Sequence, residues 1–176
     1  MVKKISICIL FFCLLISFDS FSQKKAVKRD TKDDCLAVIG FFYNKTLINK
    51  INVYLYEGLT IIDSIKTTSM KDFGFVLKKN KEYSIKIASK GYYPRLISIN
   101  TTLSDDVNTL PVFIFEFDIE LLPMMKGMDD YFTDFPIAKV EYDTKIEKFG
   151  YSKKYTASIQ KELNKVQEQI KIRKSR

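Results

Sequence analysis

The chain has 176 residues, of which 46% are hydrophobic and 28% are charged, and its formal net charge is +8. This composition is typical of a globular protein, and the length suits one domain with a small appendage. The chain contains no histidine. A Ser-His-Asp triad, a Cys-His dyad and any histidine-ligated metal site are therefore excluded.

The first residues have the pattern of a secretory signal peptide. Two lysines precede the apolar run Ile5–Phe18, which is shorter than the roughly 20 residues that span a membrane. Small residues at Ser20 and Ser22 then predict cleavage between Ser22 and Gln23. We expect residues 1–22 to be removed and the mature chain to be soluble in the periplasm, with an uncleaved N-terminal anchor as the alternative.

Only one cysteine, Cys35, lies outside the predicted signal peptide. A disulfide framework and a cysteine-rich zinc site are therefore excluded. Because Cys35 precedes the apolar run Leu36–Ile39, we expect it to be buried as a small hydrophobe, with pairing to another chain as the alternative. Residues 23–34 form a charged leader that has little to bury, and we expect it to stay in water.

Residues 35–122 are predicted to be mainly β. Apolar and polar residues alternate in several short segments, of which residues 113–121 are the clearest, and turn residues separate the segments. The segment 59–66 is irregular because Ile61 and Ile62 are adjacent, which predicts a bulge or an edge strand. We expect a seven-stranded antiparallel β-sandwich whose core includes Val53, Leu55, Phe73, Phe75, Ile85, Ile87, Phe115 and Phe117.

The remainder of the chain differs in character. Residues 123–150 mix proline, methionine and aromatic residues in a connecting segment with one further strand at 137–142. Residues 151–176 are predicted to be a C-terminal α-helix with a basic tail, because apolar residues recur every three or four positions from Tyr155. The apolar stripe of this helix either docks on the sandwich or forms a seam for a partner helix.

Two surfaces are candidates for binding a partner. We expect the helix to dock near Tyr155 while its basic end stays free, which makes Leu163, Val166 and Ile170 available to a partner. Tyr54 and Tyr56 lie on the face opposite to the apolar one and form the second candidate.

Other groups are weaker candidates for a site. The segment 91–95 is either a recognition loop or, as we expect, a turn whose aromatic residues cap the core. The acidic pairs 105–106 and 129–130 offer oxygen ligands for Ca²⁺, but they lack the spaced pattern of a calcium loop. The sequence therefore predicts no catalytic residue, no cofactor and no metal. The scattered glycines also exclude a phosphate-binding loop.

Several turn and strand features carry a family resemblance. They are the strand and turn of Val53–Gly58, the step Lys71–Phe75 into the next strand, and the later Lys90-Gly91-Tyr92. With them, residues 51–99 resemble the carboxypeptidase regulatory-like domain. The resemblance implies a transthyretin-like (prealbumin-like) β-sandwich, common in exported proteins of Gram-negative Bacteroidota, with no catalytic residues and no shared ligand.

From these observations we expect a non-catalytic protein of the periplasm or outer cell envelope of a Gram-negative bacterium. It would act as a binding or assembly module through its sandwich and its helix, with an envelope protein as partner. Nucleic acid is not expected as a partner, nor is a transmembrane segment after signal cleavage. The alternatives are a small enzyme with a carboxylate, tyrosine and lysine site, or an accessory subunit of a secretion or surface-motility apparatus.

Overall fold

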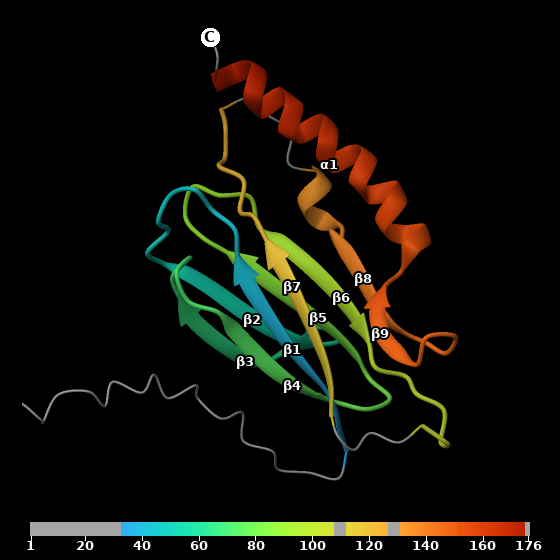
Figure 1. Ribbon diagram of the computed structural model, residues 1–176. Coiled ribbons are helices and arrows are strands. Elements are labelled where there is room, and N and C mark those ends of the chain that lie inside the picture. Colours follow the sequence, from blue (N-terminus) through green and yellow to red (C-terminus); the bar gives the residue numbers. More distant parts are fainter. Residues whose placement is uncertain (1–32, 108–111, 127–130, 175–176) are drawn as a thin grey trace, which may run out of the picture.

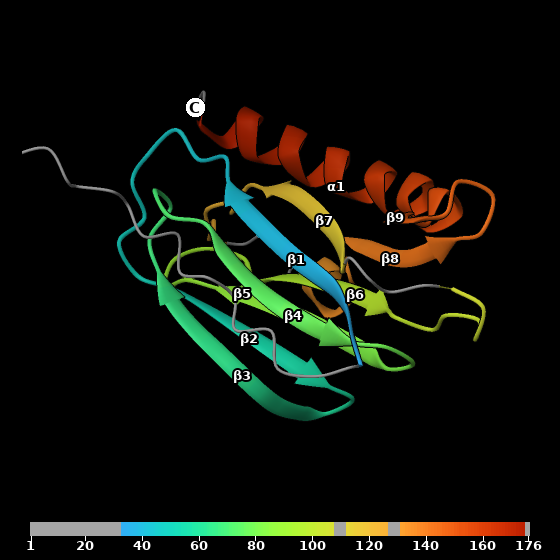
Figure 2. The same cartoon turned by 60° about the horizontal axis from the view of Figure 1, so that its bottom comes forward.

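A computed structural model describes residues 33–107, 112–126 and 131–174, which form two β-sheets and one long helix (Figures 1 and 2). The predicted cleavage site at Ser22 and Gln23 lies outside the described residues, as does nearly all of the charged leader. In chain order the elements are β1 (Asp34–Phe42), β2 (Ile51–Glu57), β3 (Thr60–Thr67), β4 (Phe73–Lys78), β5 (Glu82–Ala88), β6 (Arg95–Asn100), β7 (Phe113–Ile119), a short 3-10 helix η1 (Tyr131–Asp134), β8 (Ala138–Asp143), β9 (Lys148–Tyr151) and α1 (Lys153–Lys174).

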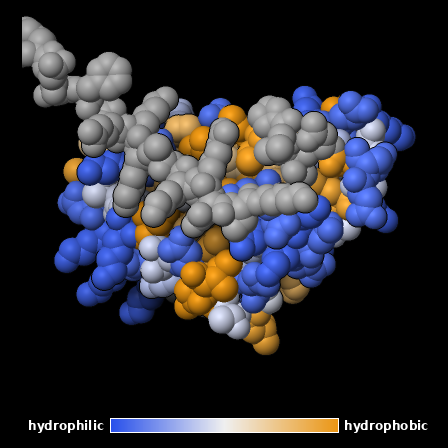
Figure 3. Space-filling model, turned by 90° about the horizontal axis from the view of Figure 1, so that it is seen from below, coloured by the Kyte–Doolittle hydropathy of each residue, from blue (hydrophilic) through white to orange (hydrophobic). Residues whose placement is uncertain are grey.

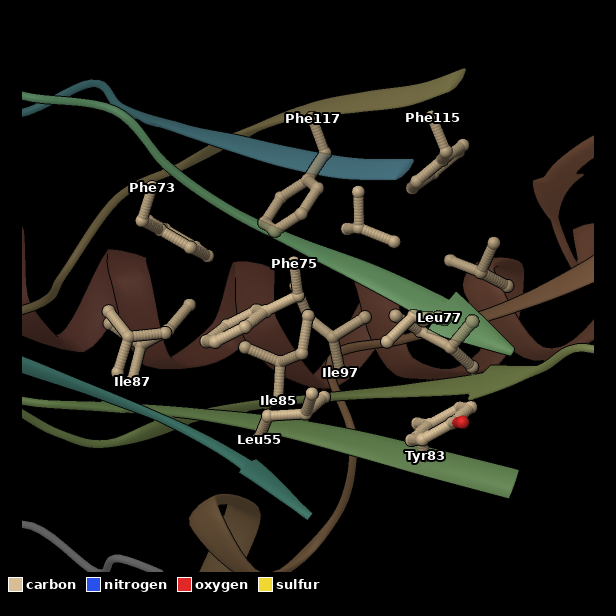
Figure 4. Close-up of a cluster of buried hydrophobic side chains, with 14 of the residues drawn as sticks. Leu55, Phe73, Phe75, Leu77, Tyr83, Ile85, Ile87, Ile97, Phe115 and Phe117 are labelled. Carbon is tan, nitrogen blue, oxygen red and sulfur yellow. The ribbon is translucent and has the colours of Figure 1, made fainter. Parts of the chain in front are cut away.

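The two sheets pack face to face around a hydrophobic core. One sheet has three strands in the order β4-β1-β7, and the other has six in the order β3-β2-β5-β6-β8-β9. Figure 4 shows side chains of β4 and β7 pointing toward side chains of β2, β5 and β6. All eight expected core residues are buried, so the predicted facing of these strands is confirmed. A Cβ on Gly40 would overlap the ring of Phe73, which explains the glycine in the middle of β1.

Two predictions about the sheets need correction. The pairing is mixed, because β1 runs parallel to β7 and β6 runs parallel to β8. The described residues also contain nine strands, since β9 follows the expected β8 and pairs with it. Alternation shows which face of a strand is buried, but it does not give the direction of its neighbour. With four residues, β9 is also too short to show a period.

The prediction of a bulge or an edge at residues 59–66 is confirmed. β3 is the outermost strand of the six-stranded sheet, and its register with β2 shifts between Leu55 and Tyr56. The turn between these two strands contains Gly58 at φ 59°, a conformation that glycine adopts without strain.

The opposite edge of the same sheet is covered. The Phe149 ring of β9 lies 5.6 Å from that of Phe113 in β7, and the Tyr151 ring lies 5.2 Å from that of Phe115. The helix then packs beyond β8 and β6, so α1 lies on the side of the molecule away from β3 in both ribbon views (Figures 1 and 2). These contacts join the two sheets at the β9 edge.

Cys35 is fully buried at the start of β1 and forms no disulfide. Burial raises the pKa of its thiol from 9.0 to about 11, and the neighbouring charge of Asp34 adds to the increase. The thiol therefore stays protonated at neutral pH and acts as a small core side chain, as predicted from its position.

Candidate functional site

The end of the helix docks on the sandwich, which corrects the expectation of a free apolar stripe. Val166 and Ile170 are 6% and 5% exposed and pack against Tyr93 and Leu122. Leu163 is half-buried beside them. Tyr93 and Leu122 come from distant parts of the chain, so the helical pattern alone did not show this apolar surface. The chain itself occupies most of the predicted helix site.

The beginning of the helix is held by polar contacts. The hydroxyl of Tyr155 donates a hydrogen bond to the carbonyl oxygen of Pro136 at 2.6 Å. The Lys139 ammonium group of β8 lies 4.8 Å from the centre of the Tyr155 ring, within the range of a cation–π contact. The predicted docking near Tyr155 is therefore confirmed.

The segment 91–95 is structural, as expected. Its backbone turns at Gly91 with φ 83°, and Tyr93 donates a backbone hydrogen bond to Leu122 at 2.9 Å. Arg95 is only 4% exposed, and its Nε donates to the carbonyl oxygen of Glu120 at 3.2 Å. Burial lowers the pKa of Arg95 to about 10, against the opposing effect of the Glu120 charge. This arginine faces the packed interior near the helix-covered end of the sandwich and not the solvent.

A carboxylate, a lysine and a tyrosine do come together at the β4–β5 hairpin. The ammonium group of Lys81 lies 2.5 Å from a carboxylate oxygen of Glu57, and this hydrogen bond raises the pKa of Lys81. The Tyr83 hydroxyl accepts a hydrogen bond from the Lys78 amide at 3.3 Å, while burial raises its pKa. A lysine nucleophile needs a lowered pKa, and so does a lysine or a tyrosine that acts as a general base near neutral pH. The group is therefore better suited to fastening the hairpin than to catalysis.

The acidic pairs give no further support for a metal site. Asp105 and Asp106 are exposed in a turn. The part of the chain that the structure describes contains no group of three or more potential metal ligands. The second acidic pair, residues 129–130, lies outside the described residues.

An apolar surface remains along β2 and β3, and we call it the β3 surface. Tyr54 and Tyr56 lie half-buried on the outer face of β2, because the alternate residues of this strand face the core. Leu59 is fully exposed, and Ile61 and Ile62 are 51% and 48% exposed. Ile61 pairs with Tyr56 across the two strands. The β3 surface therefore consists of Tyr54, Tyr56, Leu59, Ile61 and Ile62.

The two tyrosines of this surface were predicted from the sequence, but the three aliphatic residues were not. β3 lies at the lower side of the fold in Figure 1, and Figure 3, which views the molecule from below, shows hydrophobic surface between two hydrophilic regions. The irregular Ile61-Ile62 pair is the available signal, and it predicts a bulge or an edge strand but no apolar surface. An outer strand with exposed apolar residues offers a partner both apolar contacts and free backbone groups.

Comparisons with known proteins place the chain in no family. No protein-family model and no curated protein matches it. The solved structure titled "Crystal Structure of S.CueP" is similar with 14% identity and a TM-score of 0.31. The similarity covers 51% of this chain and 60% of that one, so the chain spans less than two thirds of the neighbour. Of the helices that the structure describes, none has the length and apolar character to cross a membrane.

Proposed function

We propose that this protein is a non-catalytic binding or assembly module of the cell envelope, and that the β3 surface is its main contact with a partner. The partner is a protein that adds an extended segment to β3 as a further strand. The observation that carries the proposal is an eight-residue outer strand whose first five residues, Thr60 to Ser64, are all exposed.

The backbone groups and side chains of β3 support the addition of a further strand. An outer strand presents backbone N–H and C=O groups on one side, and an added strand satisfies them. Soluble proteins commonly protect such edges with charges, prolines or very short strands. Here the edge carries Ile61 and Ile62, with Asp63 and Lys66 following toward its end. The apolar residues favour a partner segment rich in β-branched or aromatic side chains.

The free energy of association sets a lower limit on the surface that the partner must cover. Burying the exposed area of Leu59, Ile61 and Ile62 contributes about 4 kcal/mol, and each strand hydrogen bond adds about 1 kcal/mol. Association itself costs at least about 4 kcal/mol. A stable complex therefore needs the partner to cover Tyr54 and Tyr56 as well, on the outer face of β2.

The compartment and the fold family belong to the same proposal. The predicted signal peptide supports export to the periplasm or outer envelope of a Gram-negative bacterium. The turn and strand features of residues 51–99 support a carboxypeptidase regulatory-like, transthyretin-like domain. An accessory role in a secretion or surface-motility apparatus is a narrower form of this function. The raised pKa values of Lys81 and Tyr83 give the enzyme alternative less support.

Site-specific cross-linking in intact cells tests the proposal. A photo-reactive residue replaces Ile61 and, as a control, Ile114, an isoleucine on the outer strand β7 that is 67% exposed. We expect a cross-linked protein partner from position 61 and none from position 114. Hydrogen exchange of the isolated complex should then show new protection of the β3 amides. Equal cross-linking at both positions, or a complex without protection of β3, would contradict the proposal.

A further inference from the structure

A second surface, which shares no residue with the β3 surface, lies at the end of the sandwich where β2 begins and β3 ends. Residues of both strands, of the loop before β2 and of the loop after β3 line an open hollow of about 520 Å³. Three lysines, Lys50, Lys66 and Lys71, line it together with the neutral polar residues Asn49, Asn52 and Thr67. We call it the lysine hollow.

The positive charge of the hollow is not balanced by its own walls. Its lining contains no aspartate or glutamate. In the described part of the chain the ion pairs join Lys81 to Glu57 and Lys165 to Glu162, and none involves the three lysines of the hollow. The nearest acid in the sequence is Asp72, an exposed residue next to Lys71. An anion placed in the hollow is attracted by the charges of all three lysines.

Hydrogen bonds fix the backbone that carries these lysines. The Ser69 hydroxyl accepts a bond from the Ile48 amide at 2.9 Å, and the Ser69 amide donates to the Ile48 carbonyl at 2.9 Å. The Ser89 hydroxyl donates to the carbonyl of Lys50 at 2.7 Å. Asn52 lies beside Lys66 in the register of β2 and β3. The loops are therefore held in place, and a ligand orders only the lysine side chains.

A smaller hollow of about 270 Å³ adjoins the first and shares Asn49 and Lys50 with it. It adds Lys90, Ser89, the half-buried Tyr92 and the apolar residues Leu47 and Ile48, again with no acidic residue among its described lining. The two hollows together offer four ammonium groups beside several hydroxyl and amide groups. Such a surface fits a ligand that is anionic at one point and also carries polar and apolar groups.

The geometry points to a binding site for a phosphate group carried on a larger molecule, with Lys50, Lys66 and Lys71 as the residues that contact the phosphate. A lysine ammonium group is a compact point charge with three donors, and it pairs well with phosphate oxygens. Asn49, Asn52 and Thr67 supply neutral contacts for hydroxyl groups near the phosphate. The phosphate belongs either to a lipid headgroup or to a small soluble molecule, and the test below separates these sources.

The test compares two triple variants with the same net charge. The first is Lys50→Gln, Lys66→Gln and Lys71→Gln. The control is Lys78→Gln, Lys145→Gln and Lys148→Gln, which changes three exposed lysines outside both hollows. The probes are inorganic pyrophosphate, followed by NMR titration of the full exported chain, and vesicles of phosphatidylcholine with a minor fraction of phosphatidic acid, followed by flotation.

We expect the unmodified chain and the control to bind at least one probe, with amide shifts at Thr67 and Thr68 in the pyrophosphate arm. The hollow variant should bind at least about tenfold more weakly, because three charge-assisted contacts are lost. Binding of pyrophosphate indicates a soluble phosphate ligand, and binding of vesicles alone indicates a headgroup. Equal weakening in both variants, or no binding to either probe, would overturn the inference.

Discussion

The two edges of the six-stranded sheet differ in whether other parts of the described chain cover them. At the β9 edge, aromatic rings of Phe149 and Tyr151 contact β7 of the other sheet, and α1 contacts β8 and packs on Tyr93 and Leu122. At the β3 edge, the described residues provide no covering element, and three large aliphatic side chains are exposed. The C-terminal third of the chain covers one edge, whereas the apolar residues of the other edge stay exposed.

This difference indicates where stability and binding reside. On the closed side Phe149, Val166 and Ile170 are buried by the chain itself, so truncating them should lower the free energy of unfolding. Residues at the open edge bury little apolar surface when the chain folds, and a bound partner would bury more of it. Mutations at the closed edge should therefore lower stability, whereas mutations at the open edge should weaken partner binding and leave stability nearly unchanged.

The largest effect is expected for Phe115→Ala on the closed side. Phe115 is 8% exposed, and its ring contacts both Phe117 and Tyr151. Truncation of a buried phenylalanine costs about 3–5 kcal/mol, a large part of the stability of a domain. The neighbouring Glu116→Ala removes an exposed side chain of the same strand and should be mild. Urea unfolding of the two variants measures the difference, and equal losses would mean that the facing of β7 is wrong.

A smaller effect is expected for Ile170→Ala in the helix. Ile170 is 5% exposed against Tyr93 and Leu122, so its truncation should lower the free energy of unfolding by about 2–4 kcal/mol. Ile172→Ala makes the same change in the same helix at a residue that is 54% exposed, and should cost less than about 0.5 kcal/mol. Thermal unfolding distinguishes the two, and similar midpoints would show that the helix end does not dock.

The pH dependence of stability tests the burial of Cys35. Its folded pKa of about 11 lies above the ordinary 9.0, so between these values the unfolded chain has lost the thiol proton while the folded chain keeps it. The free energy of unfolding should therefore fall by about 2 kcal/mol as the pH rises from 9 to 11. Cys35→Ala should reduce this fall.

The raised pKa values of Tyr83 and Tyr151 produce a further decline in stability near the same pH. This decline is present with and without the thiol, so the difference between the two pH curves isolates Cys35. Parallel curves for the unmodified chain and the variant would contradict the burial of the thiol.

The smallest effect on stability is expected at the open edge. Ile61→Thr with Ile62→Thr keeps β-branched side chains at two half-exposed positions, so the free energy of unfolding should change by less than about 0.5 kcal/mol. Ile65→Thr in the same strand alters a side chain that packs against the core, and should cost more. Cross-linking to the partner from a photo-reactive residue at position 56 should nevertheless be lost in the double variant. A large loss of stability in that variant would show that the β3 surface is part of the core.

Much of the sandwich was determined by local sequence pattern. Alternation in 51–55, 73–77, 83–87 and 113–117 assigned the buried faces, because successive side chains of a strand point to opposite sides. The adjacent Ile61 and Ile62 indicated an irregular outer strand. The apolar residue every three or four positions indicated a helix in the C-terminal segment. Each of these inferences depends only on residues that are neighbours in the chain.

Contacts between distant segments were decided only by the tertiary structure. The parallel pairing of β1 with β7 depends on how the chain crosses from one sheet to the other, which no strand pattern encodes. The docking of Val166 and Ile170 depends on an apolar surface built by Tyr93 and Leu122, more than forty positions away along the chain. The lysine hollow likewise joins residues of β2, β3 and the loops that precede β2 and follow β3. Local periodicity determines which side of an element is apolar, whereas the partner of that side is fixed by packing among segments far apart in sequence.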